Sequence, residues 1–148
     1  MKLTTIEITS LDELDVFAKD NLDLILENKV VLLSGDLGAG KTALVKAFGR
    51  AFQVEENVSS PTFSLINEYM GFYQNRSIPI YHVDLYRIES VDELEEIGFE
   101  EYLDQDAIIF IEWPEIAQPF IMDNALTIRI EIFDNSKRRL NLSNSSRQ

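Results

Sequence analysis

Four residues at fixed spacing in the first third of the chain could hold the phosphates of a nucleotide. Gly35, Gly40, Lys41 and Thr42 form the pattern Gly-x-x-x-x-Gly-Lys-Thr. Glycines permit backbone conformations that a side chain would forbid, so several N–H groups can turn inward as a nest for an anion. In this pattern the lysine reaches the β and γ phosphates, and the threonine hydroxyl ligates magnesium. We expect the whole loop to contact a nucleoside triphosphate through Asp36, Leu37, Gly38, Ala39, Gly40, Lys41 and Thr42.

Such a phosphate-binding loop, or P-loop, needs an acidic partner for magnesium at the end of a buried strand. The apolar run 107–111 leads directly to Glu112. Glu112 would hold magnesium directly or through water, or orient the attacking water, unless it is an ordinary surface glutamate. Asp84 follows a second predicted strand and could be a metal ligand, a base, or only a turn residue. We take Lys41, Asp84 and Glu112 as candidate catalytic residues, and Thr42 and Glu112 as candidate metal ligands.

Several neighbouring positions leave two interpretations open. Strand alternation places His82 on the same face as Asp84, where it is either a buried hydrogen-bonding residue or a catalyst. The stretch 60–63, with Thr62, lies where switch loops of GTPases sense a γ-phosphate, although a plain loop is the better interpretation of its spacing. Trp113 could cover the nucleotide or simply pack.

The elements that position these residues follow from hydrophobic spacing. Alternating or continuous apolar runs predict strands, and i, i+3, i+4 spacing predicts helices. Capping-box patterns at Ser10 and Ser90 mark two helix starts. The strands are expected at 4–9, 30–33, 63–69, 78–83, 107–111, 126–133 and 138–142, and the helices at 11–27, 41–52 and 91–97.

This order of elements predicts an α/β P-loop NTPase. We expect a mixed, mostly parallel sheet flanked by helices, with a C-terminal β-hairpin. The 148 residues suit a single domain over 1–148, with a frayed tail at about 143–148.

Composition narrows the class of protein further. The chain has no cysteine and one histidine, so disulfides, thiolate metal sites and multi-histidine zinc sites are excluded. The net charge is −13, which disfavours stable binding of tRNA by the chain alone and indicates either solubility or docking onto a basic partner. With no signal peptide and no apolar run long enough to span a membrane, a cytoplasmic protein is expected.

Two motifs that the sequence lacks restrict the choice of nucleotide and of function. No Asn-Lys-x-Asp element, which reads guanine in GTPases, follows the P-loop. The seven arginines are scattered apart from Arg138-Arg139, whereas small-molecule kinases usually carry an arginine-rich lid. ATP is therefore the expected nucleotide, and a small-molecule kinase on the same scaffold is the alternative function.

Five sequence blocks in a fixed order resemble one family. They are GDLGAGKT (35–42), SPTF (60–63), HVDLYR (82–87), ELEEIGFEEYL (93–103) and IEWPE (111–115). Together they resemble the TsaE (YjeE) family, small P-loop ATPases of bacterial tRNA threonylcarbamoyladenosine synthesis. The resemblance covers about residues 6–142.

The resemblance implies a weak ATP hydrolase (ATPase) with bound Mg²⁺ that is activated by the TsaB–TsaD heterodimer. Its ATP hydrolysis would support repeated turnover of the modification at tRNA position 37. By matching motif, Glu112 would be the Walker B acid, and Asp84 an essential acid near the γ-phosphate. Further nucleotide contacts implied by the resemblance are Thr9, Ser10, Thr62, Trp113 and Arg138.

Overall fold

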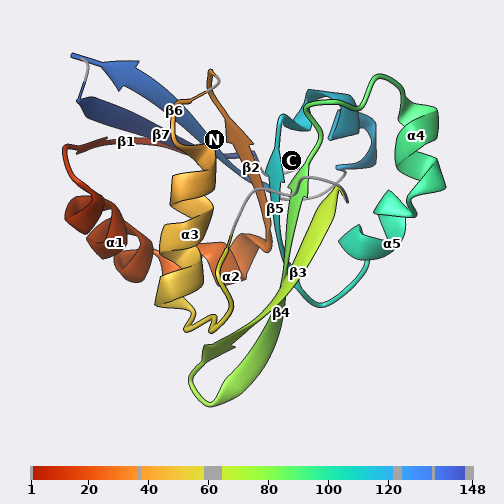
Figure 1. Ribbon diagram of the computed structural model, residues 1–148, viewed down its shortest axis with the longest axis horizontal. Coiled ribbons are helices and arrows are strands. Elements are labelled where there is room, and N and C mark those ends of the chain that lie inside the picture. Colours follow the sequence, from red (N-terminus) through yellow and green to blue (C-terminus); the bar gives the residue numbers. More distant parts are fainter. Residues whose placement is uncertain (1, 37, 59–64, 122–124, 135, 146–148) are drawn as a thin grey trace.

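The computed structural model describes residues 2–36, 38–58, 65–121, 125–134 and 136–145. Within these residues, one sheet of seven strands crosses the molecule in the order β1-β7-β6-β2-β5-β4-β3 (Figure 1). The strands are β1 (Lys2–Ile8), β2 (Val30–Ser34), β3 (Ile66–Tyr73), β4 (Arg76–Asp84), β5 (Ile108–Glu112), β6 (Ala125–Phe133) and β7 (Lys137–Ser145). The helices are α1 (Leu11–Asp20), α2 (Leu22–Asn28), α3 (Lys41–Ala51), α4 (Val91–Glu96), α5 (Phe99–Leu103) and the 3₁₀ helix η1 (Pro114–Phe120).

The sheet is mixed and mostly parallel, as predicted. Strands β6, β2, β5 and β4 are mutually parallel neighbours. Only β3 and β7, among the described strands, run in the opposite direction, because β7 pairs antiparallel with both β6 and β1 and β3 pairs antiparallel with β4. The carboxyl ends of β2, β4 and β5 therefore meet at one edge, where open α/β sheets bind their ligands.

Helices cover both faces of the sheet (Figure 1). On one face, α3 packs Phe48 against Phe110 of β5, with the ring centroids 5.5 Å apart. α1 packs on α3 through Phe17, whose ring centroid lies 6.0 Å from that of Phe48. A second apolar cluster, which includes Leu94 and Phe99, joins α4 and α5 to the opposite face. Burial on both faces explains the continuous apolar sequence of the central strands.

The helix expected over 11–27 is two helices. Asn21 ends α1 and precedes α2, and its side-chain amide donates to the Phe17 carbonyl at 2.8 Å. A side chain that bonds the backbone in this way competes with helix propagation. The predicted start is confirmed, because the Ser10 hydroxyl accepts the Glu13 N–H.

Other boundaries also differ from the expected ones, and two short helices were not expected. β7 continues to Ser145, so the tail expected to fray from 143 begins as a paired strand. β3 extends to Tyr73, beyond the predicted end at 69. Helices α5 and η1 were not predicted, since Gly98 with φ 71° separates α4 from α5 and Pro114 opens a short 3₁₀ helix. None of the helices in the described ranges is long and apolar enough to cross a membrane.

Candidate nucleotide-binding site

The glycine-rich loop joins the end of β2 to the start of α3. Gly35, Gly38 and Gly40 all have positive φ, at 142°, 79° and 112°. A Cβ on Gly35 would lie 2.5 Å from the Ile130 carbonyl oxygen, so this position has no room for a side chain. Gly40 caps α3 in the left-handed conformation. The loop therefore directs the N-terminus of α3 toward the sheet edge, as an anion site requires. The expected contact Leu37 lies outside the described residues.

Lys41 is buried at the first position of α3. Its ammonium donates to the carbonyls of Gly35 at 2.7 Å and Asp36 at 3.1 Å, and it lies 4.2 Å from the centroid of the Trp113 ring. Burial lowers the pKa of Lys41, although the charges of Glu112 and Asp84 oppose this shift. The site thus holds a desolvated cation beside its own loop, where an anionic ligand would stabilise it.

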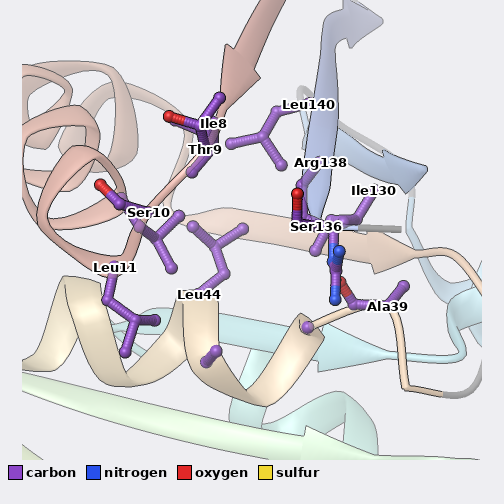
Figure 2. A pocket seen from close by; sticks show the side chains of 13 residues that line it. Ile8, Thr9, Ser10, Leu11, Ala39, Leu44, Ile130, Ser136, Arg138 and Leu140 are labelled. Carbon is purple, nitrogen blue, oxygen red and sulfur yellow. The ribbon is translucent and has the colours of Figure 1, made fainter. Parts of the chain in front are cut away.

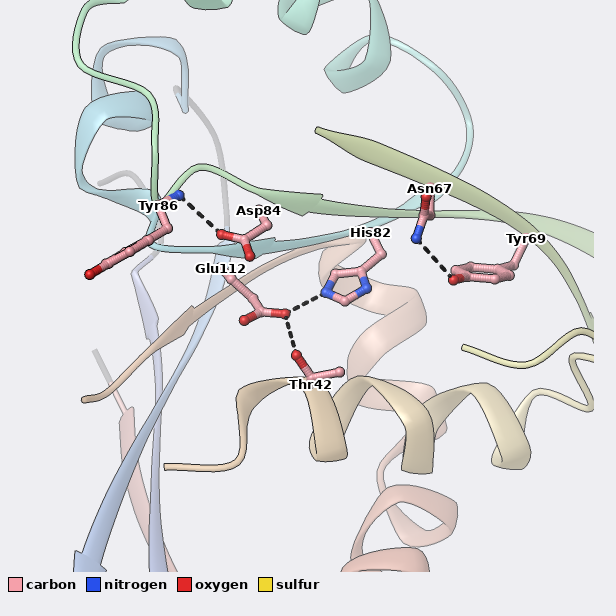
Figure 3. A network of polar contacts seen from close by, with 7 residues as sticks. All are labelled: Thr42, Asn67, Tyr69, His82, Asp84, Tyr86 and Glu112. Atoms are coloured by element: carbon pink, nitrogen blue, oxygen red, sulfur yellow. Dashed lines mark hydrogen bonds and ion pairs between the residues drawn. The ribbon is translucent and has the colours of Figure 1, made fainter. Parts of the chain in front are cut away.

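Glu112 ends β5 and has 4% of its surface exposed. Strand register places it beside Leu33 of β2 and Asp84 of β4. Its Oε2 accepts the Thr42 hydroxyl at 3.1 Å and lies 2.5 Å from His82 Nε2 (Figure 3). The predicted metal ligands Thr42 and Glu112, which are 70 residues apart in sequence, are therefore in direct contact.

Asp84 lies at the end of β4, next to Glu112 in register. One of its carboxylate oxygens accepts the Tyr86 N–H at 3.0 Å (Figure 3). Partial burial raises the pKa of Asp84; the Tyr86 hydrogen bond opposes the shift, and the Glu112 charge adds to it. A carboxylate with a raised pKa at the edge of a cleft is suited to accept a proton.

These residues line one open cleft of about 260 Å³. Trp113 forms one wall with an unusual backbone φ of 57°, and its ring lies 4.9 Å from that of Tyr86. The lining residues are Gly38, Gly40, Lys41, Thr42, Ala43, Asp84, Tyr86, Glu112 and Trp113. Tyr86 was not predicted as a site residue, although strand alternation, which puts residues two apart on one face, could have indicated it.

A second cavity of about 280 Å³ adjoins the cleft and shares Gly40 and Ala43 with it. Thr9, Ser10 and Arg138, which the resemblance implies as nucleotide contacts, line it (Figure 2). The remaining walls are mostly apolar: Ile8, Leu11, Leu14, Leu44, Ile130 and Leu140, with Ala39 and Ser136 beside them. Ser136 and these apolar residues were missed, because their sequence pattern indicates only a turn and core packing.

Arg138 connects the β6–β7 hairpin to the glycine-rich loop by a hydrogen bond. Its Nε donates to the Ala39 carbonyl at 2.8 Å across 99 residues of sequence. The predicted contact Thr62 lies outside the described residues. Of the other site residues proposed from the sequence that the structure describes, all but Asp36 border one of the two adjoining cavities.

The oxygen donors at the cleft suit magnesium. The described residues contain no group of three or more His, Cys, Asp or Glu side chains placed to hold a metal ion. Magnesium usually keeps several waters and takes one or two protein carboxylates together with substrate phosphates, so Thr42 and Glu112 would suit it as protein ligands.

Comparison with known proteins decides the family. The model of the family described as "Threonylcarbamoyl adenosine biosynthesis protein TsaE" matches residues 8–140. The chain belongs to the TsaE family. This family acts in the biosynthesis of threonylcarbamoyladenosine in tRNA, so the resemblance seen in the five sequence blocks is confirmed.

TsaE proteins of two bacteria are similar to this chain along most of their length. The chain is 40% identical to that of Rickettsia typhi over 123 residues, which are 82% of each chain. It is 33% identical to that of Bacillus subtilis over 129 residues, which are 87% of this chain and 78% of the relative. The crystal structure of Bacillus subtilis YdiB superimposes with a TM-score of 0.71 over 99% of this chain and 87% of that one, at 23% identity, which supports the fold.

Proposed function

We propose that this chain is an ATPase that binds Mg-ATP, hydrolyses it slowly when alone, and supports turnover of the tRNA threonylcarbamoyladenosine machinery together with TsaB and TsaD. The observation that carries the proposal is the contact between Thr42 and Glu112 at 3.1 Å, within the cleft that Lys41 enters. A P-loop threonine and a strand-end carboxylate at this spacing form the magnesium site of such enzymes.

Each residue of the cleft then has a role that its environment suits. Lys41 exchanges the carbonyls of Gly35 and Asp36 for phosphate oxygens, whose negative charge opposes the lowering of its pKa by burial. Thr42 and Glu112 would hold magnesium, which would neutralise charge on the phosphates. Asp84, whose pKa is raised by burial, orients the attacking water and takes its proton.

The cavity between α1 and the hairpin is proposed to take the adenosine part of the nucleotide. Its apolar walls and its position next to Gly40 suit a flat base whose phosphates lie in the loop. Thr9 and Ser10 offer hydroxyls, and Arg138 a cation, at its rim. The Arg138 contact with the Ala39 carbonyl would hold the rim and the loop in one arrangement.

Activation by a partner fits the charges of the cleft. Among its described lining residues, Lys41 is the one cation, and Asp84 and Glu112 are both acidic. Phosphoryl transfer is accelerated by a further cation, which a partner can supply in trans. We propose that TsaB–TsaD provides this stabilisation.

The acidic surface supports docking to a protein with basic groups. No lysine or arginine occurs between Ile88 and Ile128. The exposed acidic residues of helices α4 and α5 in this stretch are Asp92, Glu95, Glu96, Glu100 and Glu101. Such a surface repels the phosphate backbone of tRNA, so we propose that tRNA is held by the partners in the cytoplasm and not by this chain alone.

A reconstitution experiment tests the proposed function. Purified TsaB–TsaD, a threonylcarbamoyl donor and tRNA should give about one round of modification without this chain and repeated rounds with the chain and ATP. Lys41→Met should remove the effect, and Lys46→Met, on the exposed side of the same helix, should keep it. Equal product with and without the chain would contradict the proposal.

A further inference from the structure

We infer that His82 is a positioning residue for Glu112: its Nε2–H holds one carboxylate oxygen so that the other faces the magnesium and water side of the cleft. The inference rests on the proposed function, since it assumes that Glu112 serves a bound metal. It assigns a task to the histidine, for which the sequence left two interpretations open.

The metal-binding role proposed for Glu112, which requires an ionised carboxylate, sets the direction of the contact. His82 Nε2 lies 2.5 Å from Glu112 Oε2, and both side chains are buried, at 0% and 5% exposure. An ionised carboxylate can only accept hydrogen bonds, so the proton of this contact lies on Nε2. Charge-assisted bonds of this kind are short and strong, and one carboxylate rotamer is thereby favoured.

The same oxygen accepts a second bond, from the Thr42 hydroxyl at 3.1 Å. Two donors on Oε2 leave Oε1 pointing away from both, as Figure 3 shows. Glu112 also lines the cleft with Lys41 and Asp84. His82 therefore reaches the cleft only through Glu112, since it is not among the described residues that line it.

Packing alone gives no reason for an imidazole at this position. His82 is fully buried in β4, and its Nδ1 has no hydrogen-bond partner in the part of the chain that the structure describes. A buried polar atom without a partner destabilises the folded state. A leucine would fill much of the volume without that loss, so the histidine is explained by its donor to Glu112.

This arrangement makes a specific prediction for magnesium. Residues that orient metal ligands typically change metal affinity or activity by about 10- to 100-fold when replaced. Loss of the Nε2 donor should therefore raise the magnesium concentration that is needed to tighten nucleotide binding. Nucleotide affinity without metal, which depends on Lys41 and the loop, should stay unchanged.

The test is calorimetric titration of the wild type and three variants with the β,γ-imido analogue of ATP, in EDTA and across a magnesium series. His82→Gln keeps an amide N–H at about the Nε2 position, whereas His82→Asn is too short and His82→Leu has no donor. We expect the magnesium concentration for half-maximal tightening to rise about 10- to 100-fold in the Leu and Asn variants, and to stay near the wild-type value in the Gln variant.

Circular dichroism identifies a variant that does not fold. If the His82→Leu variant does not fold, the comparison of His82→Gln with His82→Asn tests the inference. Wild-type magnesium dependence in a folded Leu or Asn variant would overturn the inference, as would a Gln variant as impaired as Asn. Wild-type protein that binds the analogue without any magnesium effect would instead contradict the proposed function and this inference with it. A result that contradicts only the positioning role of His82 can thus be distinguished from one that contradicts the proposed function.

Discussion

The ammonium of Lys41 lies 4.2 Å from the centroid of the Trp113 ring, at a distance where a cation interacts with the face of an indole. Trp113 is the only tryptophan in the sequence. Tryptophan emission can therefore be assigned to this one position in the chain, beside Lys41.

Binding of Mg-ATP should change Trp113 emission in a saturable way, because Lys41 leaves the ring and the loop carbonyls for the phosphates. A fluorescence titration measures this change. Lys41→Met should show no comparable change, and Lys46→Met should respond as the wild type does. The same response in Lys41→Met would show that Trp113 senses something other than this lysine.

Gly35→Ala should lower the free energy of unfolding more than Gly38→Ala. Both glycines have positive φ, but an added Cβ at Gly35 would meet the Ile130 carbonyl at 2.5 Å, whereas the space at Gly38 is open. Backbone strain alone costs about 1–3 kcal/mol, and we expect the clash to add about 1–3 kcal/mol at Gly35. Urea denaturation of the two variants measures the difference, and equal losses would contradict this account of the loop.

Asp84→Asn should separate catalysis from stability. Asparagine can still accept the Tyr86 N–H but cannot take a proton from water. We expect phosphate release to fall about 10²- to 10⁴-fold. Nucleotide affinity, measured in parallel, should change far less, and a variant with wild-type phosphate release would exclude Asp84 as the base.

The stability of the wild type should depend on pH through Asp84, and the same variant should lack this dependence. Burial raises the pKa of Asp84 above its unfolded value of 3.8. Between these two pKa values the folded state binds more protons than the unfolded state, so the unfolding free energy falls as pH rises. The Asp84→Asn variant would escape this loss, because the amide does not titrate. Urea denaturation should show the variant more stable than the wild type at about pH 7, with the gain absent at about pH 3.

Arg138→Ala should weaken nucleotide binding, while Arg139→Ala should not. Arg138 donates to the Ala39 carbonyl and lines the cavity proposed for adenosine. Arg139 lies on the opposite face of β7, where it pairs with Glu7 at 3.6 Å. Loss of one charge-assisted hydrogen bond between Arg138 and the nucleotide, about 1.5–3 kcal/mol, corresponds to roughly a 10- to 100-fold weaker nucleotide affinity in calorimetry. Equal effects of the two variants would argue against the adenosine cavity.

Much of the site could be predicted because its signals are local. The spacing from Gly35 to Thr42 is typical of one loop conformation, the P-loop. The apolar runs that end in Asp84 and Glu112 predict two strands whose carboxyl ends place both acids at the same sheet edge. The contact of His82 with Glu112 could not be predicted, because it depends on the parallel pairing of β4 with β5. The break at Asn21 was missed because apolar periodicity continues through it, while a side-chain hydrogen bond to Phe17 ends the helix.

Steady-state phosphate release from ATP tests the central claim most directly. Wild-type protein with magnesium should release phosphate slowly, and TsaB–TsaD should raise the rate. Lys41→Met and Glu112→Ala should lose this activity with and without the partner proteins, whereas Lys46→Met should retain it. Phosphate release that persists at the wild-type rate in folded Lys41→Met or Glu112→Ala would contradict the assignment of the P-loop cleft as the ATPase site.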